Sequence, residues 1–217
     1  MKESGYGRLE STCNPDTVSD GRGGIFTWVP EEPIEKYRMI HCNPVTKVRE
    51  EHTSKSKEYL LITGGSGAIV FKEPSRDREV FHVSKGDCIY ASPGIAHTVV
   101  PITPLTGIEM LTERGDESET GYGSESETGY GLIKPTCNID ASLDGSGGIF
   151  TWVPNKAIKE FSLIYYTPGT VRGEHHHPEF IEYLLILDGS GQIVFKEPSR
   201  DREVFPLSKG DCIYASP

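Results

Sequence analysis

A short segment near the C-terminal end of the chain carries two histidines and a glutamate at a spacing that suits metal binding. His175 and His177 are separated by one residue, and Glu182 follows after a gap of four residues. In a β-strand, residues two positions apart point to the same face, so both imidazoles would face the same way. A glutamate that opens the next strand, about 4.8 Å away, can reach them. Two histidines and one carboxylate would occupy three coordination positions of a metal ion and leave the others open. The set therefore predicts a divalent transition metal such as Fe, Mn, Ni or Zn.

The chain contains an internal duplication. The octapeptide GGIFTWVP occurs at Gly23–Pro30 and again at Gly147–Pro154, an offset of 124 residues (147 − 23). At the same offset, the 36-residue block Glu58–Pro93 matches Glu182–Pro217 with differences at only five positions. A period of this size is that of a small domain and not of a solenoid repeat. The sequence therefore predicts two copies of one domain that share a backbone.

The two copies are separated by an acidic segment rich in glycine and serine. We assign the first copy to residues 8–113, the linker to residues 114–131 and the second copy to residues 132–217. The linker lacks aliphatic residues, so it cannot bury enough apolar surface to offset the entropy of ordering, and we expect it to be flexible. The second copy stops at Pro217, before any counterpart of Gly94–Thr112 in the first copy. We therefore expect its barrel to be incomplete and to be completed by inter-domain docking or by a homodimer partner.

The pattern within each copy predicts an all-β fold. Short apolar runs such as Phe161–Tyr166, Tyr183–Leu187 and Glu203–Leu207 are separated by Pro-Gly, Asp-Gly and Lys-Gly turn sequences. Many short strands with frequent turn sequences are typical of a sandwich or a barrel. Trp28 and Trp152 lie in the repeated octapeptide and are predicted to belong to the core.

Charge and composition exclude several classes of partner. The formal net charge is -10, which disfavours nucleic acid, and no apolar run approaches the roughly 18 residues of a membrane span. The start of the chain shows no signal peptide. The five cysteines never form a C-x-x-C pair, and Cys88 and Cys212 are predicted to be small buried residues. These features favour free thiols and a cytoplasmic location.

Two segments resemble the conserved motifs of the cupin superfamily. The first is Gly169-(5)-His175-x-His177-(4)-Glu182-(6)-Gly189, and the second is Gly86-(5)-Ser92-Pro93-Gly94-(2)-His97. The resemblance implies two tandem cupin barrels of the jelly-roll type, the second truncated at its C-terminal end. It also implies a set of metal ligands, which are His175, His177 and Glu182 in the second copy and His52, Glu58 and His97 in the first. The first copy has lost one histidine, because Ser54 aligns with His177.

The segment Val171-Arg172-Gly173-Glu174-His175-x-His177 is similar to the active-site segment of cupins that act on nucleotide sugars, the dTDP-4-keto sugar 3,4-ketoisomerases. This resemblance implies that Arg172 contacts a small-molecule substrate and that His175 or His177 is the catalytic base. A histidine that titrates near neutrality suits proton transfer next to a carbonyl.

Three functions therefore remain open at this point. The first is a metal-binding isomerase or epimerase that acts on a sugar or nucleotide-sugar derivative. The second is a non-haem iron dioxygenase, since a facial set of ligands with open positions suits oxygen activation. The third is a sugar-binding or structural cupin without catalysis, because one fold hosts many chemistries.

Overall fold

A computed structural model describes residues 5–13, 23–44, 53–72, 78–113, 130–133, 136–138, 147–154, 156–171, 177–196 and 202–217. These residues form β-strands and turns, with no helix among them, so the prediction of an all-β fold is confirmed. No helix within these ranges could cross a membrane. The chain divides into two compact units, described here one at a time. Unit 1 comprises Met1–Tyr122 with Thr136–Gly173, and unit 2 comprises Gly123–Pro135 with Glu174–Pro217.

The strands of unit 1 are β1 (Tyr6–Leu9), β2 (Thr12–Cys13), β3 (Gly23–Trp28), β4 (Lys36–Cys42), β5 (Glu58–Gly64), β6 (Ser66–Lys72), β7 (Glu79–Ser84), β8 (Cys88–Ala91), β9 (Ala96–Pro101), β10 (Leu105–Leu111), β12 (Thr136–Asn138), β13 (Gly147–Trp152) and β14 (Phe161–Tyr166). Those of unit 2 are β11 (Tyr130–Ile133), β15 (Glu182–Leu185), β16 (Ser190–Phe195), β17 (Glu203–Ser208) and β18 (Cys212–Ala215). The first residues of β11 lie within the range that the sequence assigned to the linker.

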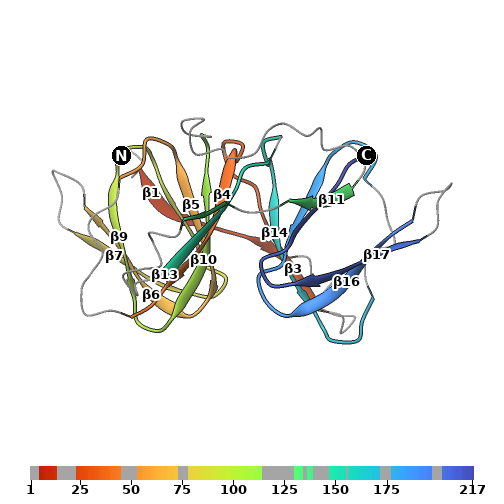
Figure 1. Cartoon of the computed structure of the whole chain (residues 1–217). Helices are drawn as coiled ribbons and strands as arrows, with labels where there is room; N and C mark the ends of the chain where they lie inside the picture. Colours follow the sequence, from red (N-terminus) through yellow and green to blue (C-terminus); the bar gives the residue numbers. More distant parts are fainter. Residues whose placement is uncertain are drawn as a thin grey trace. The chain divides into compact units, whose positions relative to one another are not determined.

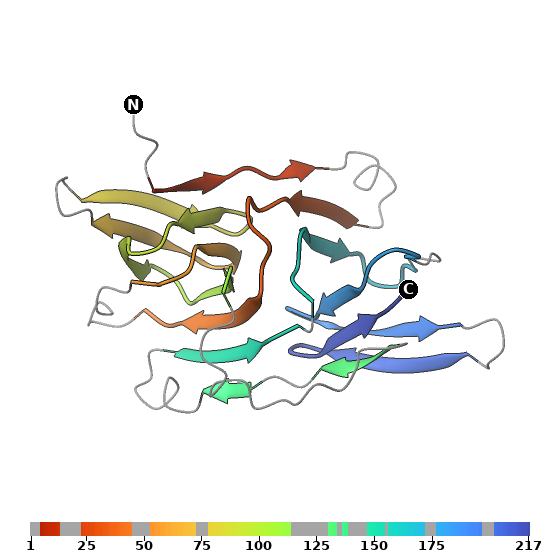
Figure 2. The same cartoon turned by 90° about the horizontal axis from the view of Figure 1, so that it is seen from above.

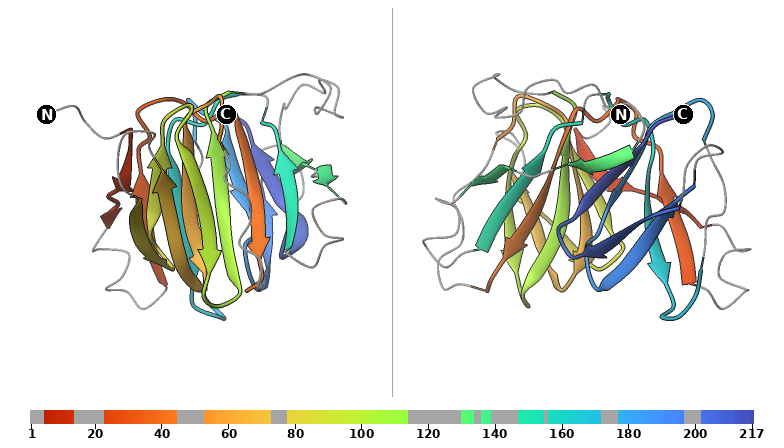
Figure 3. Two further views of the ribbon diagram at one scale, coloured as in Figure 1. Left: turned by 90° about the vertical axis from the view of Figure 1, so that its left-hand side faces the viewer. Right: turned by 45° about the vertical axis from the view of Figure 1, so that its right-hand side comes forward.

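Two sheets of unit 1 enclose a hydrophobic core. One sheet has seven strands in the order β1-β8-β5-β10-β4-β13-β12, and the other has three in the order β7-β6-β9. In the left panel of Figure 3, the green strand β10 runs beside the orange strand β4. Side chains from both sheets form the core, among them Ile40, Ile62 and Leu105 from the larger sheet and Ile69 and Phe71 from the smaller. Strands β4, β5, β6 and β10 bury residues at consecutive as well as alternate positions, so side chains on both faces of these strands are covered.

The two sequence copies exchange strands within unit 1. Strand β13 of the second copy pairs with β4 of the first, and β14 of the second copy pairs with β3 of the first. In Figure 1 and Figure 2 the teal strand β13 lies beside the orange strand β4. The two pairings have the same register: Trp152 is opposite Tyr37, and Trp28 is opposite Phe161, which is 124 residues after Tyr37.

The aromatic side chains at the exchanged strands are packed in the same way in both pairs. The rings of Tyr37 and Trp152 are stacked with centroids 5.7 Å apart, and those of Trp28 and Phe161 with centroids 5.6 Å apart. Both tryptophans are 2% exposed, which confirms their prediction as core residues. Because β3, β4, β13 and β14 all belong to unit 1, the sequence copies and the compact units divide the chain at different places.

Unit 2 contains a three-stranded sheet, β11-β18-β15, and the hairpin β16-β17. The register of each pair repeats that of its counterpart in unit 1 at the offset of 124: Tyr183 is opposite Tyr214 as Tyr59 is opposite Tyr90. In unit 1, β5 also pairs with β10, and β6 also pairs with β9. Among the described residues, β15 pairs only with β18, and β16 only with β17. The sheets of unit 2 are therefore smaller than their counterparts.

Among the residues whose side chains the structure describes, three cysteines, Cys42, Cys88 and Cys212, are buried and form no disulfide bond. Burial removes the thiolate from water and raises the pKa of Cys88 to about 12. The prediction that Cys88 and Cys212 are buried is confirmed, and their thiols are small apolar groups of the core.

Candidate functional site

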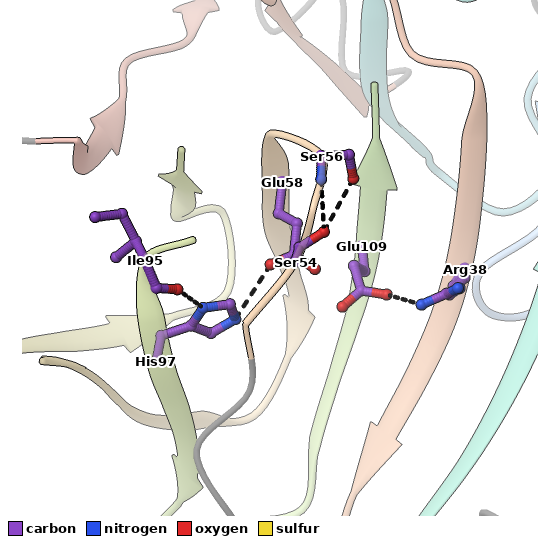
Figure 4. A network of polar contacts seen from close by, with 7 residues as sticks. All are labelled: Arg38, Ser54, Ser56, Glu58, Ile95, His97 and Glu109. Atoms are coloured by element: carbon purple, nitrogen blue, oxygen red, sulfur yellow. Dashed lines mark hydrogen bonds and ion pairs between the residues drawn. The ribbon is translucent and has the colours of Figure 1, made fainter. Parts of the chain in front are cut away.

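Glu58 and His97 meet in the interior of unit 1, and each comes from a different sheet. Glu58 is the first residue of β5 and His97 the second residue of β9. Glu58 Oε2 lies 3.5 Å from His97 Nε2, and the two side chains are only 5% and 12% exposed. Figure 4 shows the imidazole and the carboxylate pointing toward one another. The fold thus brings together two residues that are 39 positions apart in the sequence (97 − 58).

The contacts of the His97 ring define where its protons lie. Nδ1 is 3.3 Å from the carbonyl oxygen of Ile95, which can only accept a hydrogen bond, so Nδ1 carries the donated proton. Nε2 then faces the Glu58 carboxylate. An imidazole nitrogen and a carboxylate oxygen that face each other at 3.5 Å form the arrangement of a general acid–base pair.

The chain that leads into β5 is fixed to the turn before β9. The backbone N–H of Gly94 donates to the carbonyl oxygen of Ser54 over 2.8 Å. The Ser54 hydroxyl in turn accepts a hydrogen bond of 3.1 Å from the backbone N–H of Ser56. These contacts, drawn in part in Figure 4, hold the start of β5 next to β9 and so set the position of Glu58 opposite His97.

Lys57 anchors the other side of the strand start. Its ammonium group pairs with the Glu31 carboxylate and lies 5.8 Å above the centre of the Tyr59 ring. Burial lowers the pKa of Lys57, but the hydrogen bond that it donates to Glu31 and the nearby negative charges raise it more, so the net pKa lies above its ordinary value. Burial has the opposite effect on Tyr59 and raises its pKa, because the charged form of tyrosine is the phenolate. Lys57 is therefore a charged anchor that contacts Glu31 and the rings of Tyr59 and Tyr90, the latter 5.5 Å away.

Arg38 and Glu109 form a second charged pair, which the sequence analysis did not single out. They lie directly opposite each other on β4 and β10, and Arg38 Nη1 is 3.1 Å from Glu109 Oε2. Glu109 is also opposite Leu60, so it lies on the same face of the sheet as Glu58, one row further along. A signal was present in the sequence for Glu109, which is the only charged residue of β10, but not for Arg38, which shares β4 with Lys36. Figure 4 shows both pairs in one view.

Unit 2 brings together another histidine and glutamate. His177 Nε2 lies 3.7 Å from Glu182 Oε2, and the side chains are 29% and 44% exposed. The His177 ring also packs against Phe180, with ring centroids 4.3 Å apart. This pair is more exposed than Glu58 and His97, so water screens its charges more strongly.

Three residues that the sequence analysis proposed lie outside the described ranges, namely His52, Arg172 and His175. Within the described ranges, no three His, Cys, Asp or Glu side chains converge in a way that could hold a metal ion. The structure thus places four of the six proposed ligands, as two His–Glu pairs, one in each unit. Their role as ligands remains a prediction.

No protein-family model matches the sequence, and no curated protein does either. The chain is similar to the solved structure of QdtA, a sugar 3,4-ketoisomerase from Thermoanaerobacterium thermosaccharolyticum, with 16% identity, a TM-score of 0.43 and coverage of 54% of this chain and 87% of QdtA. It is also similar to WlaRB, a TDP-quinovose 3,4-ketoisomerase from Campylobacter jejuni, with 13% identity, a TM-score of 0.43 and coverage of 54% and 89%.

A third similar structure is the capsular polysaccharide assembling protein CapF from Staphylococcus aureus. Its identity to this chain is 19% and the TM-score 0.35, over 50% of this chain and 30% of CapF. At this level of identity and structural similarity, the comparison assigns no activity and no ligand to this chain. What the chain does must therefore be argued from its own residues.

Proposed function

We propose that this chain is a cupin-type isomerase or epimerase that moves a proton next to the carbonyl group of a sugar derivative. The observation that carries the proposal is the buried pair of Glu58 and His97, with Nε2 and Oε2 3.5 Å apart and Nδ1 held by the Ile95 carbonyl. An imidazole fixed in one orientation, with a carboxylate beside it, is suited to general acid–base catalysis.

The pair can complete a proton transfer without any net change in its own protonation. Neutral His97 takes the proton from the carbon next to the carbonyl group, and the C–H electron pair forms the carbon–carbon double bond of an enediol. Protonated Glu58 gives its proton to the carbonyl oxygen. The reverse transfers, to the other carbon or to the other face of the same carbon, give the isomer or the epimer. General acid–base groups of this kind contribute about 10²- to 10⁴-fold to a rate.

Arg38 gives the same interior face a fixed positive charge. Its guanidinium is held by Glu109 at 3.1 Å, so the side chain is oriented before a substrate binds. We propose that the positive charge of the Arg38 guanidinium orients the oxygens of the substrate and stabilises the oxygen that gains negative charge during the reaction.

The test uses deuterium. The full chain is incubated in D₂O with a panel of 4-keto nucleotide sugars, and proton NMR follows exchange at the carbons next to the carbonyl. The proposal predicts enzyme-dependent exchange with at least one member of the panel. No exchange with any of them, accompanied by oxygen consumption in the presence of Fe(II), would replace the isomerase with the dioxygenase alternative.

A second candidate function is the binding of a divalent metal, favoured by the two His–Glu pairs. Each pair supplies one nitrogen and one oxygen donor, while a catalytic zinc site takes three protein ligands. His52 in the first copy and His175 in the second would be the third donors. A bound ion would act as a Lewis acid on the carbonyl oxygen.

The metal is tested by elemental analysis of untagged protein. His177→Ala should lower the bound metal, whereas His82→Ala, a change at an exposed histidine of β7, should leave it unchanged. Affinity should also fall as the pH drops below about 6.5, because a histidine ligand must be deprotonated. Metal content that is the same in wild type and His177→Ala would remove His177 from the ligand set.

A further inference from the structure

Two contacts cross the interior of unit 1 between the same two rows of residues. In the larger sheet, Tyr6 of β1 and Glu58 of β5 are both directly opposite Ala91 of β8, so the three form one row. In the smaller sheet, Phe71 of β6 is directly opposite His97 of β9. Glu58 faces His97 from one sheet to the other. The ring of Tyr6 is stacked on that of Phe71, with centroids 4.3 Å apart and the planes inclined by 10°. An apolar contact and the acid–base contact therefore join the same two rows.

The ring of Phe71 lies beside the His97 imidazole. The two ring centroids are 5.9 Å apart, and the planes are inclined by 46°. Phe71 is only 1% exposed, and besides its stack on Tyr6 it forms a T-shaped contact with Phe81, with centroids 5.6 Å apart. Because protein interiors are closely packed, a Phe71 ring that moved would leave a gap next to the imidazole. The orientation of His97 thus depends on what holds Phe71.

Tyr6 is attached to both sheets. Its backbone belongs to β1, which pairs with β8 of the larger sheet, and the carbonyl oxygen of Gly5 accepts a hydrogen bond of 2.6 Å from the N–H of Ser92. Its hydroxyl donates over 3.0 Å to the carboxylate of Glu79, the first residue of β7 in the smaller sheet. Tyr6 itself is 2% exposed. The residue therefore fixes the separation of the two sheets at the rows that carry the acid–base pair.

The second copy of the sequence keeps the same combination of residues. Tyr130 and Phe195 follow Tyr6 and Phe71 at the repeat offset of 124 residues (130 − 6 and 195 − 71). Tyr130 and Glu182 are both directly opposite Ala215, which repeats the row of the larger sheet in unit 1. The tyrosine thus accompanies the glutamate of the His–Glu pair in both copies.

We propose that Tyr6 is a positioning residue of the acid–base pair. By stacking on Phe71 it fixes the His97 ring in the orientation that faces Glu58. This role rests on the proposed function, in which the pair transfers a proton next to a carbonyl group. A displacement of about 1 Å in such a site can lower a rate by about 10²-fold, even when the change lies away from the reacting atoms. The N-terminal strand β1 therefore contributes to the site, although neither motif includes it.

The first test compares Tyr6→Leu with Tyr6→Phe in the deuterium-exchange assay with 4-keto nucleotide sugars. Leucine removes the ring from the stack, so kcat should fall by about 10- to 10²-fold while KM stays within about twofold of wild type. Phenylalanine keeps the stack and loses only the hydroxyl, so it should restore most of kcat. Ile62→Val, a change in the same core further along β5, is the control for a loosened core and should exchange at the wild-type rate.

A second readout needs no substrate. The proton on Nδ1 of His97, which the carbonyl oxygen of Ile95 accepts at 3.3 Å, should give a resolved proton NMR signal while the ring is held in place. The signal should be present in wild type and Tyr6→Phe and should be lost in Tyr6→Leu, because a mobile ring exposes this proton to exchange with water. If Tyr6→Leu does not fold, Tyr6→Met takes its place, since methionine adapts to irregular space but supplies no ring.

The two readouts distinguish the role of Tyr6 from the proposed function. A wild-type protein that exchanges deuterium into none of the sugars, but whose Nδ1 signal is lost in Tyr6→Leu, would remove the proposed function and leave the positioning of His97 by Tyr6 in place. A folded Tyr6→Leu protein that keeps the signal, or that exchanges deuterium at the wild-type rate, would overturn the positioning role. A Tyr6→Phe protein as impaired as Tyr6→Leu would also overturn it, because the hydroxyl and not the stack would then hold the site.

Discussion

Ile34 and Ile158 hydrogen-bond to each other in both directions: the N–H of each donates to the carbonyl oxygen of the other over 2.6 Å. The two residues are 124 positions apart (158 − 34), which is the repeat offset, so each is bonded to its own counterpart in the other copy. A residue can bond reciprocally to its counterpart only on a two-fold axis of pseudosymmetry. Ile34 is fully buried, so this axis runs through the core of unit 1 and the strands exchange around it.

A disulfide would test the strand exchange. Thr27 and Ser162 are directly opposite each other on β3 and β14, with their hydroxyl oxygens 2.8 Å apart. The double variant Thr27→Cys/Ser162→Cys should therefore form an intramolecular disulfide on mild oxidation, visible as a monomer with faster migration on non-reducing gels. The control is Thr27→Cys/Arg38→Cys, which would be opposite only if each copy paired its own strands. A disulfide in the control and none in the first variant would contradict the exchange.

Two equivalent glycines should respond differently to the same substitution. A Cβ atom at Gly67 would lie 2.6 Å from the backbone oxygen of Val100 in β9, whereas one at Gly191 would meet no described atom within 4 Å. Gly67→Ala should therefore lower the free energy of unfolding by about 1–3 kcal/mol. Gly191→Ala should be neutral, or stabilising by about 0.5–1 kcal/mol, because alanine loses less backbone entropy in a strand. Equal effects, measured by urea denaturation, would show that β16 is covered as β6 is.

The buried thiol of Cys88 should make stability depend on pH in the alkaline range. Its pKa is about 12 in the folded state against 9.0 for an unperturbed thiol, so the folded state binds the proton more tightly. The resulting stabilisation is fully present below pH 9.0 and is lost as the pH rises toward about 12. The urea midpoint of wild type should fall more steeply than that of Cys88→Ala between these values. Parallel curves for the two proteins would be inconsistent with a buried thiol.

The sequence predicted the strands well because their periodicity is local. Phe161–Tyr166 was predicted as a strand and is β14, and the burial of Trp28 and Trp152 followed from their place in the repeated octapeptide. Which copy supplies the partner of β4 could not be predicted. Strands β3 and β13 both read GGIFTW, so either would give β4 the same register and the same side-chain contacts.

For the candidate site, too, the sequence predicted individual residues but not how they pair. The motifs named Glu58 and His97, but only the packing of two sheets shows that their side chains are 3.5 Å apart. Arg38 and Glu109 belong to no motif, and their pairing depends on the register of β10 against β4. Such cross-strand pairs are set by sheet register, which a single strand sequence does not contain.

The most direct test of the account compares deuterium exchange into a 4-keto nucleotide sugar by wild type and by Glu58→Gln. Glutamine keeps the size of the side chain but cannot hold or release the shared proton, so the exchange rate should fall by about 10²- to 10⁴-fold. Glu179→Gln, a change at an exposed position of unit 2, is the control and should exchange at the wild-type rate, and equal melting temperatures would show that both variants are folded. A folded Glu58→Gln protein that exchanges as fast as wild type would contradict the assignment of Glu58 and His97 as the acid–base pair.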